Sequence, residues 1–94
     1  MSEDLKAVRW TLSGRVQGVG FRYFAYHEAL RLGVVGTVRN LYSGDVEVYA
    51  EGPEDVLLLF RSRLEKGPSF GCVTGIEEEW ATATGKHKEF QITH

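Results

Sequence analysis

Apolar and polar residues alternate near the start of the chain, and the pattern then changes to a longer period. Residues 8–13 read VRWTLS, so every second side chain is apolar, as in a strand with one buried face. The glycine-rich stretch at residues 14–20 does not favour a continued strand. Apolar residues then recur at helical spacing, at Phe21, Phe24, Ala25, Ala29 and Leu32. The pattern therefore predicts a strand, a glycine-rich loop and a helix that ends at Gly33.

A second strand, a turn and a third strand are expected after this helix. The second strand should span about residues 34–41, and YSGD at residues 42–45 is typical of a hairpin turn. Residues 46–51 read VEVYAE, in which apolar and polar side chains alternate again. These two strands are therefore expected to form an antiparallel hairpin.

A second helix is predicted after the third strand. Pro53 suits the first position of a helix, and Glu54 and Asp55 complement the helix dipole in the first turn. The KGP of residues 66–68 ends the helix. Its buried stripe is expected at Val56, Leu57, Phe60 and Leu64.

Residues 76–80 indicate a fourth strand, and residues 90–92 allow a short fifth one after a turn at Gly85. The order βαββαβ predicts an α+β, ferredoxin-like sandwich, with an antiparallel sheet of four to five strands and two helices on one face. Residues 1–94 are expected to form a single domain. The first helix makes the first two strands parallel, so their C-terminal ends lie at the same edge. The glycine-rich loop and Asn40, at the end of the second strand, should therefore be neighbours.

Composition narrows the class of protein without identifying it. The chain has 94 residues, with 11 Lys or Arg and 13 Asp or Glu, for a formal net charge of −2. Its first 40 residues are net basic and the remainder is net acidic. A basic segment can mark a site for an anionic partner, and it can equally be scattered surface charge.

Secretion, membrane and metal signals are weak in this sequence. The acidic start MSED has no apolar stretch behind it, so no secretory signal is expected. The strongly apolar run from Val56 to Phe60 is far too short to span a bilayer. A single cysteine, Cys72, can form neither an internal disulfide nor a cysteine metal cage. We expect a cytoplasmic protein without a membrane partner.

The segment GRVQGVGFR, residues 14–22, is the most informative motif. Its three glycines let the backbone turn sharply and bring its amides close to a ligand. The helix that follows offers unpaired N–H groups and a dipole that favours an anion. Arg22 opposes this dipole unless an anion is bound, and its guanidinium can hold two oxygens of one phosphate. The motif is neither a Walker P-loop nor a Rossmann fingerprint, and an ordinary loop with a solvated Arg22 is the alternative interpretation.

Together with GTVRN at residues 36–40, this segment resembles the two motifs of the acylphosphatase family. The resemblance covers essentially the whole chain and includes Gly52-Pro53 before the second helix. It implies hydrolysis of the carboxyl–phosphate bond of acyl phosphates to a carboxylate and inorganic phosphate, without a metal, a cofactor or a covalent intermediate. It also implies that Arg22 binds the phosphate and that Asn40 orients the attacking water. The implied cradle of mainly backbone amides comprises Arg15, Val16, Gln17, Gly18, Val19 and Gly20.

This activity agrees with the chemistry of the residues. An acyl phosphate is already activated, so positioning and electrostatic stabilisation can supply most of the catalysis. The Asn40 amide is no base at neutral pH, but it can donate and accept hydrogen bonds to a water. The chain departs from the family pattern at Thr37, where many members have an aromatic residue, and at Ser43-Gly44, where Asp-Gly is frequent. Both departures concern the rate and the acyl-group preference rather than the reaction class.

Other polar residues are expected to have structural roles. His27, His87 and His94 have no metal-ligand spacing, and His27 with Glu28 is expected on a solvated helix face. Cys72 is expected to be an inert, partly buried thiol. The triplet at residues 77–79 is expected to solubilise an edge strand rather than bind a cation.

Among the aromatic residues, Trp10, Tyr23 and Tyr26 are expected in packing or on the surface, and one of the tyrosines is a candidate for the acyl side of the site. RNA-recognition domains share the βαββαβ order, but residues 45–51 are acidic and would repel phosphates. A phosphate-binding domain without activity is a further alternative, against which Arg22 and Asn40 both argue. We therefore expect a monomer that binds no nucleic acid.

Overall fold

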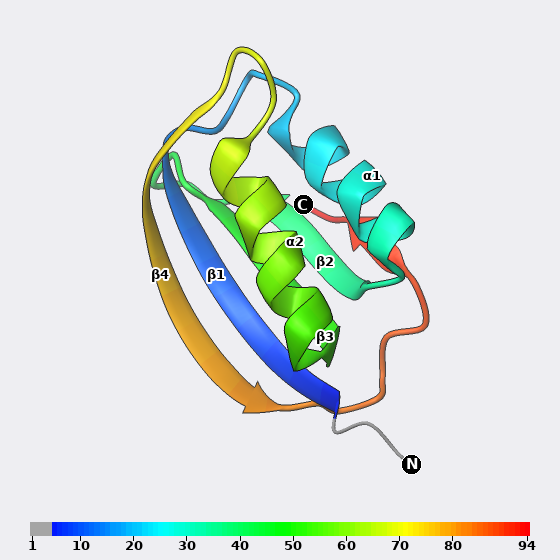
Figure 1. Cartoon of the computed structure of the whole chain (residues 1–94). Coiled ribbons are helices and arrows are strands. Elements are labelled where there is room, and N and C mark those ends of the chain that lie inside the picture. Colours follow the sequence, from blue (N-terminus) through cyan, green and yellow to red (C-terminus); the bar gives the residue numbers. More distant parts are fainter. Residues whose placement is uncertain (1–4) are drawn as a thin grey trace.

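A five-stranded sheet carries two helices on one of its faces in the computed structural model, which describes residues 5–94 (Figure 1). The chain forms, in order, β1 (Leu5–Arg15), α1 (Phe21–Leu32), β2 (Val35–Asn40), β3 (Val46–Pro53), α2 (Glu54–Lys66), β4 (Cys72–Thr82) and β5 (Phe90–Ile92). The strands lie in the order β4-β1-β3-β2-β5. The predicted ferredoxin-like α+β architecture is confirmed.

The sheet is mixed, whereas the sequence predicted an antiparallel one. β1 pairs antiparallel with both β3 and β4, and β2 pairs antiparallel with β3. The fifth strand differs, because β5 pairs parallel with β2. After β4, at one edge of the sheet, the chain crosses to the opposite edge before it forms β5 (Figure 1). It therefore enters β5 in the same direction as β2.

The core lies between the sheet and the helices, as the alternation predicted. Val8, Trp10 and Leu12 of β1 are fully buried. The Trp10 ring meets the Phe60 ring of α2 edge-on, with a centroid distance of 5.8 Å. Phe60 meets Phe90 of β5 in the same way at 5.8 Å. Such edge-on aromatic pairs stabilise the packing beyond the area they bury.

Three details of the helices differ from the predictions. Pro53 has an extended conformation, with φ −63° and ψ 145°, and it precedes α2, whose first residue is Glu54. Val56 is only half-buried. Glu28, expected in solvent beside His27, is buried with 8% exposure. The reason is its pairing with Arg63 of α2, at 2.6 Å between Nη1 and Oε1.

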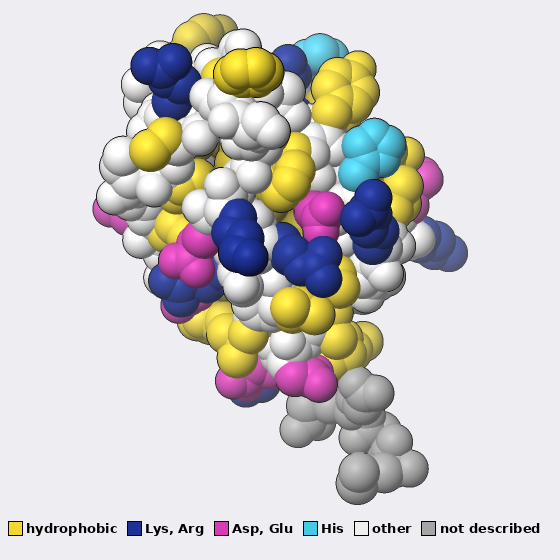
Figure 2. Space-filling model, turned by 45° about the horizontal axis from the view of Figure 1, so that its top comes forward, with side chains coloured by type: hydrophobic (Ala, Val, Ile, Leu, Met, Phe, Trp, Pro, Cys, Tyr) yellow, Lys and Arg dark blue, Asp and Glu magenta, His cyan; other side chains and the backbone are white. Residues whose placement is uncertain are grey.

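The helical face of the molecule mixes charges of both signs. In Figure 2 basic side chains lie next to acidic ones on this face and form no broad basic surface. Arg31 also lies near Glu28, at 3.8 Å. No helix within residues 5–94 has the length and apolar character needed to cross a bilayer.

The open face of the sheet is not arranged for stacking nucleic-acid bases. Glu47 of β3 contacts both Arg39 of β2, at 2.9 Å, and Arg9 of β1, at 3.6 Å. The Tyr49 ring lies against the Arg9 guanidinium, at 5.4 Å, and against the His87 ring, at 5.3 Å. Because the arginines face a carboxylate and the tyrosine is covered, this face does not favour the RNA-binding alternative.

The opposite end of the sheet from the glycine-rich loop is held by one carboxylate. Glu51, at the end of β3, is 4% exposed and accepts hydrogen bonds from Tyr49 Oη, Thr84 N, Thr84 Oγ1 and Gly85 N. Burial alone would raise the pKa of Glu51, but these hydrogen bonds outweigh it and hold the pKa at about 2. Glu51 therefore fastens the crossover between β4 and β5 to the sheet.

Candidate active site

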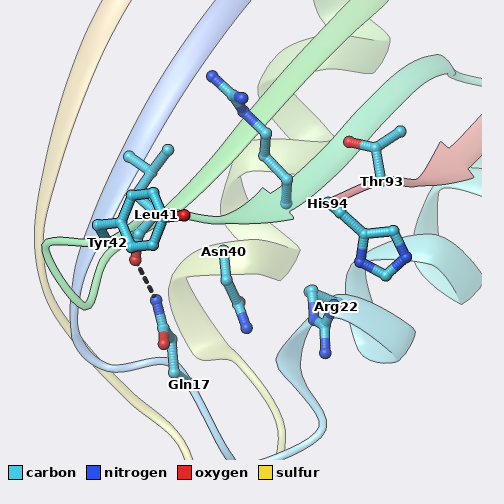
Figure 3. Close-up of a pocket in the computed structure, with 8 residues that line it drawn as sticks. Gln17, Arg22, Asn40, Leu41, Tyr42, Thr93 and His94 are labelled. Carbon is cyan, nitrogen blue, oxygen red and sulfur yellow. Dashed lines mark hydrogen bonds between the residues drawn. The ribbon is translucent and has the colours of Figure 1, made fainter.

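A pocket of about 650 Å³ lies where β2 ends and the loop after β1 meets α1 (Figure 3). The side chains of Gln17, Arg22 and Asn40 come from three different segments and converge on it (Figure 3). The complete lining is Gln17, Arg22, Arg39, Asn40, Leu41, Tyr42, Thr93 and His94. The prediction that the glycine-rich loop lies beside the end of the second strand is confirmed.

The loop between β1 and α1 presents free backbone donors. Gly18 and Gly20 have positive φ values of 75° and 78°, a conformation that glycine adopts without strain. Gly20 precedes the first helical residue, and no side chain among residues 5–94 caps α1. Across residues 17–23, no backbone N–H donates to an acceptor within the described part of the chain. The start of α1 is therefore open to an anion.

Other residues of the predicted cradle hold the loop in place and do not border the pocket. The Val16 side chain is buried in the core, and Val19 packs against the core. Arg15 is still part of β1 and pairs with Cys72 of β4. Of the six cradle residues, only Gln17 lines the pocket, so any role of the others rests on their backbone.

Arg22 has no carboxylate partner within residues 5–94. It is half-buried in the first turn of α1, a turn that contains no acidic residue. Among the arginines of residues 5–94, only Arg15 and Arg22 lack a carboxylate within 4.0 Å. Because Arg22 also faces the pocket and Arg15 does not, Arg22 is the guanidinium available to an anionic ligand.

Asn40 carries a buried polar atom that has no partner in the described part of the chain. Asn40 is the last residue of β2 and pairs with Val46 of β3. Its Oδ1 is buried and accepts no hydrogen bond from any residue that the structure describes. An unsatisfied buried acceptor costs about 1–3 kcal/mol of stability. Its side chain points into the space between Gln17 and Arg22 (Figure 3), so the Asn40 amide belongs to the pocket lining.

The pocket contains residues that the sequence did not point to. Neither Tyr23 nor Tyr26 lines it, and the tyrosine that does is Tyr42, two residues after Asn40. Thr93 and His94 reach the pocket because β5 runs parallel to β2, and Thr93 N donates to Val38 O at 2.9 Å. No motif marks these residues, because their place depends on how the last strand pairs.

Polar groups outside the pocket have structural partners. Glu78 of the acidic triplet accepts a hydrogen bond from the Trp10 indole at 2.8 Å and from Arg61 at 3.1 Å. The Trp10 bond, supported by Arg61, lowers the pKa of Glu78.

Cys72 is exposed, whereas a partly buried thiol was predicted. No cluster of His, Cys, Asp and Glu suited to a metal occurs in the described part of the chain.

Comparison with known proteins decides the family. A family model described as Acylphosphatase matches residues 8–92. The chain belongs to the acylphosphatase family. An acylphosphatase of Rhizobium etli is 44% identical over 93 residues, which cover 99% of each chain. One of Solibacter usitatus is 49% identical over 87 residues, covering 93% of this chain and 90% of the relative.

The fold of this family is also the fold of the chain. The crystal structure of acylphosphatase from Bacillus subtilis superposes with a TM-score of 0.92 at 39% identity, covering 95% of this chain and 99% of that one. The predicted family, fold and enzyme class are thereby confirmed. The protein is an acylphosphatase-family hydrolase of small acyl phosphates.

Proposed function

We propose that Arg22, the amides of residues 15–20 and Asn40 together carry out the hydrolysis of an acyl phosphate. The observation that carries this proposal is the meeting of two unsatisfied groups in one pocket. Arg22 has no carboxylate partner within residues 5–94, and Asn40 Oδ1 has no hydrogen-bond donor there. Both groups therefore have bonding capacity free for substrate and water.

The phosphate group binds at the start of α1. The free loop amides and the positive end of the helix dipole surround its oxygens, and the Arg22 guanidinium holds two of them. Negative charge on the phosphoryl oxygens is then stabilised by donors that are already in place before the reaction. Arg22 and the loop are therefore the phosphate-binding part of the site.

Asn40 holds the attacking water. Its side-chain amide forms a hydrogen bond with the water, which directs the water oxygen toward the phosphorus. The leaving carboxylate is a weak base, with a pKa near that of an ordinary carboxyl of about 4, so it departs without a proton donor. Positioning and electrostatics are sufficient for this reaction, and neither a metal nor a covalent intermediate is required.

We also propose that residues 1–94 act as a single domain and as a cytoplasmic monomer that binds no nucleic acid. The single, exposed thiol of Cys72 suits a reducing compartment.

Hydrolysis of benzoyl phosphate in ¹⁸O-labelled water with EDTA tests the mechanism. We expect phosphate release in EDTA and ¹⁸O in the inorganic phosphate, because the water attacks phosphorus. Label in the benzoate, or turnover that needs added metal, would contradict the proposal. Binding of phosphate without any turnover would favour the inactive phosphate-binding domain instead.

A further inference from the structure

The Gln17 side chain joins the phosphate loop to the hairpin turn that follows Asn40. Its Nε2 donates to the carbonyl oxygen of Leu41 at 2.8 Å and to that of Asp45 at 2.9 Å. The first of these bonds is visible in Figure 3. A primary amide nitrogen has two hydrogens, so both are used in these bonds and neither is left for a substrate.

The two carbonyls that Gln17 binds lie at the two ends of the turn. Leu41 N donates to Asp45 O at 2.9 Å, and Gly44 N donates to Leu41 O at 3.1 Å. Gln17 therefore holds a turn whose own hydrogen bonds are already formed, and its contribution is to set the position of that turn relative to the loop. Leu41 directly follows Asn40, so the position of the turn also sets the position of the Asn40 side chain.

We infer that Gln17 is a positioning residue, which holds Asn40 in register with the phosphate loop through Leu41 and Asp45. This inference rests on the proposed role of Asn40. The water on Asn40 must face the phosphorus of a phosphate held by the loop, and a misplacement of about 1 Å can cost about 100-fold in rate. Gln17 links these two parts of the site directly, across 24 residues of sequence to Leu41.

A double-mutant cycle with Gln17→Met and Asn40→Ala tests the inference. Methionine keeps the length and approximate volume of glutamine and removes both donors. We expect Gln17→Met to lower kcat for benzoyl phosphate about 10-fold, the equivalent of one or two lost hydrogen bonds. The competitive inhibition constant of inorganic phosphate should change less than kcat, because the loop amides remain. In the Asn40→Ala background, Gln17→Met should have little further effect on kcat.

Ser43→Ala is the matched control. Ser43 Oγ accepts a hydrogen bond from Asp45 N at 3.3 Å within the same turn, but it makes no link to the loop. This variant should keep kcat within about twofold of the parent. Urea unfolding of each variant shows whether a loss of kcat reflects a loss of folded protein, and Gln17→Ala provides a second truncation if Gln17→Met folds poorly.

The cycle separates failure of the inference from failure of the proposed function. If the kcat effects of Gln17→Met and Asn40→Ala multiply, Gln17 acts independently of Asn40 and the inference is wrong. A rise in the phosphate inhibition constant larger than the fall in kcat would place Gln17 in the phosphate cradle and would also overturn it. If Asn40→Ala leaves kcat unchanged, the proposed role of Asn40 falls, and the inference falls with it.

Discussion

The two ends of the sheet treat their polar groups in opposite ways. At the end that contains the pocket, loop amides, the Arg22 guanidinium and Asn40 Oδ1 all lack partners among residues 5–94. At the other end, the buried Glu51 carboxylate accepts hydrogen bonds from Tyr49, Thr84 and Gly85. At the pocket end these groups keep hydrogen-bonding capacity for a ligand, whereas at the other end Glu51 uses its capacity in bonds within the chain.

This difference separates residues that serve activity from residues that serve stability. A buried group without a partner destabilises the folded state, whereas a satisfied one contributes to it. Substitutions of the unpartnered groups, at Arg22 and Asn40, should therefore change turnover and leave the free energy of unfolding nearly constant. Substitutions at Glu51 should do the reverse.

The largest effect is expected from Arg22→Ala. This variant should lower kcat/KM for benzoyl phosphate about 1,000-fold, because the main cation of the phosphate site is lost. Inorganic phosphate should also inhibit it more weakly. Arg22→Lys keeps the charge but loses the two-point grip, so its activity should lie between those of the parent and the alanine variant.

Arg31→Ala is the control for this prediction. Arg31 lies in the last turn of the same helix, and its side chain is 73% exposed. Normal activity in Arg22→Ala, or an equal loss in Arg31→Ala, would contradict the assignment of Arg22 to the phosphate site.

Asn40→Ala should lower kcat about 100-fold while the inhibition constant of inorganic phosphate stays within about twofold. Its free energy of unfolding in urea should not fall, because the removed Oδ1 has no partner within the described chain. A loss of stability with unchanged kcat would show that Asn40 serves the stability of the fold rather than activity, and would contradict the difference between the two ends of the sheet.

Glu51→Gln should lower the free energy of unfolding by about 2 kcal/mol, because the amide accepts hydrogen bonds less strongly than the carboxylate. Its kcat at 25 °C should match that of the parent, since Glu51 lies at the far end of β3 from the pocket. Urea unfolding and steady-state kinetics measure both quantities.

The pH dependence of stability provides the control for this variant. The pKa of Glu51 is about 2 in the folded protein, whereas an unperturbed glutamate, as in the unfolded chain, has a pKa of 4.5. Ionisation of Glu51 therefore favours folding. This contribution is complete above about pH 5 and decreases as the pH falls from about 4.5 toward 2. The parent should therefore lose more stability between pH 5 and pH 3 than Glu51→Gln, and equal losses would exclude the carboxylate as the anchor.

The sequence predicted much of the fold because the apolar pattern is local. Alternation at residues 8–13 and helical spacing from Phe21 place the buried faces correctly. The prediction from the sequence was wrong for Glu28, because the burial of this residue depends on Arg63 in the other helix. It also failed on the direction of the fifth strand, because direction depends on which edge of the sheet the chain reaches.

The candidate site was predictable where a motif marks it and unpredictable elsewhere. Two short motifs and the parallel arrangement of β1 and β2 predict that Arg22 and Asn40 lie close together, and both line the same pocket. The bonds from Gln17 to Leu41 and Asp45 follow no spacing rule, since they form between segments that meet only in the folded sheet. Thr93 and His94 were missed for the same reason.

The interior position of β1, between β4 and β3, has a consequence for how the chain folds. On one side of β1, Leu12 pairs with Val46 of β3, and on the other side Lys6 pairs with Thr82 of β4. Both neighbours of β1 in the sheet therefore come from much later parts of the sequence. Such non-local pairing requires large loops to close before favourable contacts form, which slows folding compared with helical proteins of similar length. The apolar face of β1 is then exposed for longer during folding, and the charges of the edge strand β4 at Glu77 and Glu79 oppose strand-to-strand association between molecules.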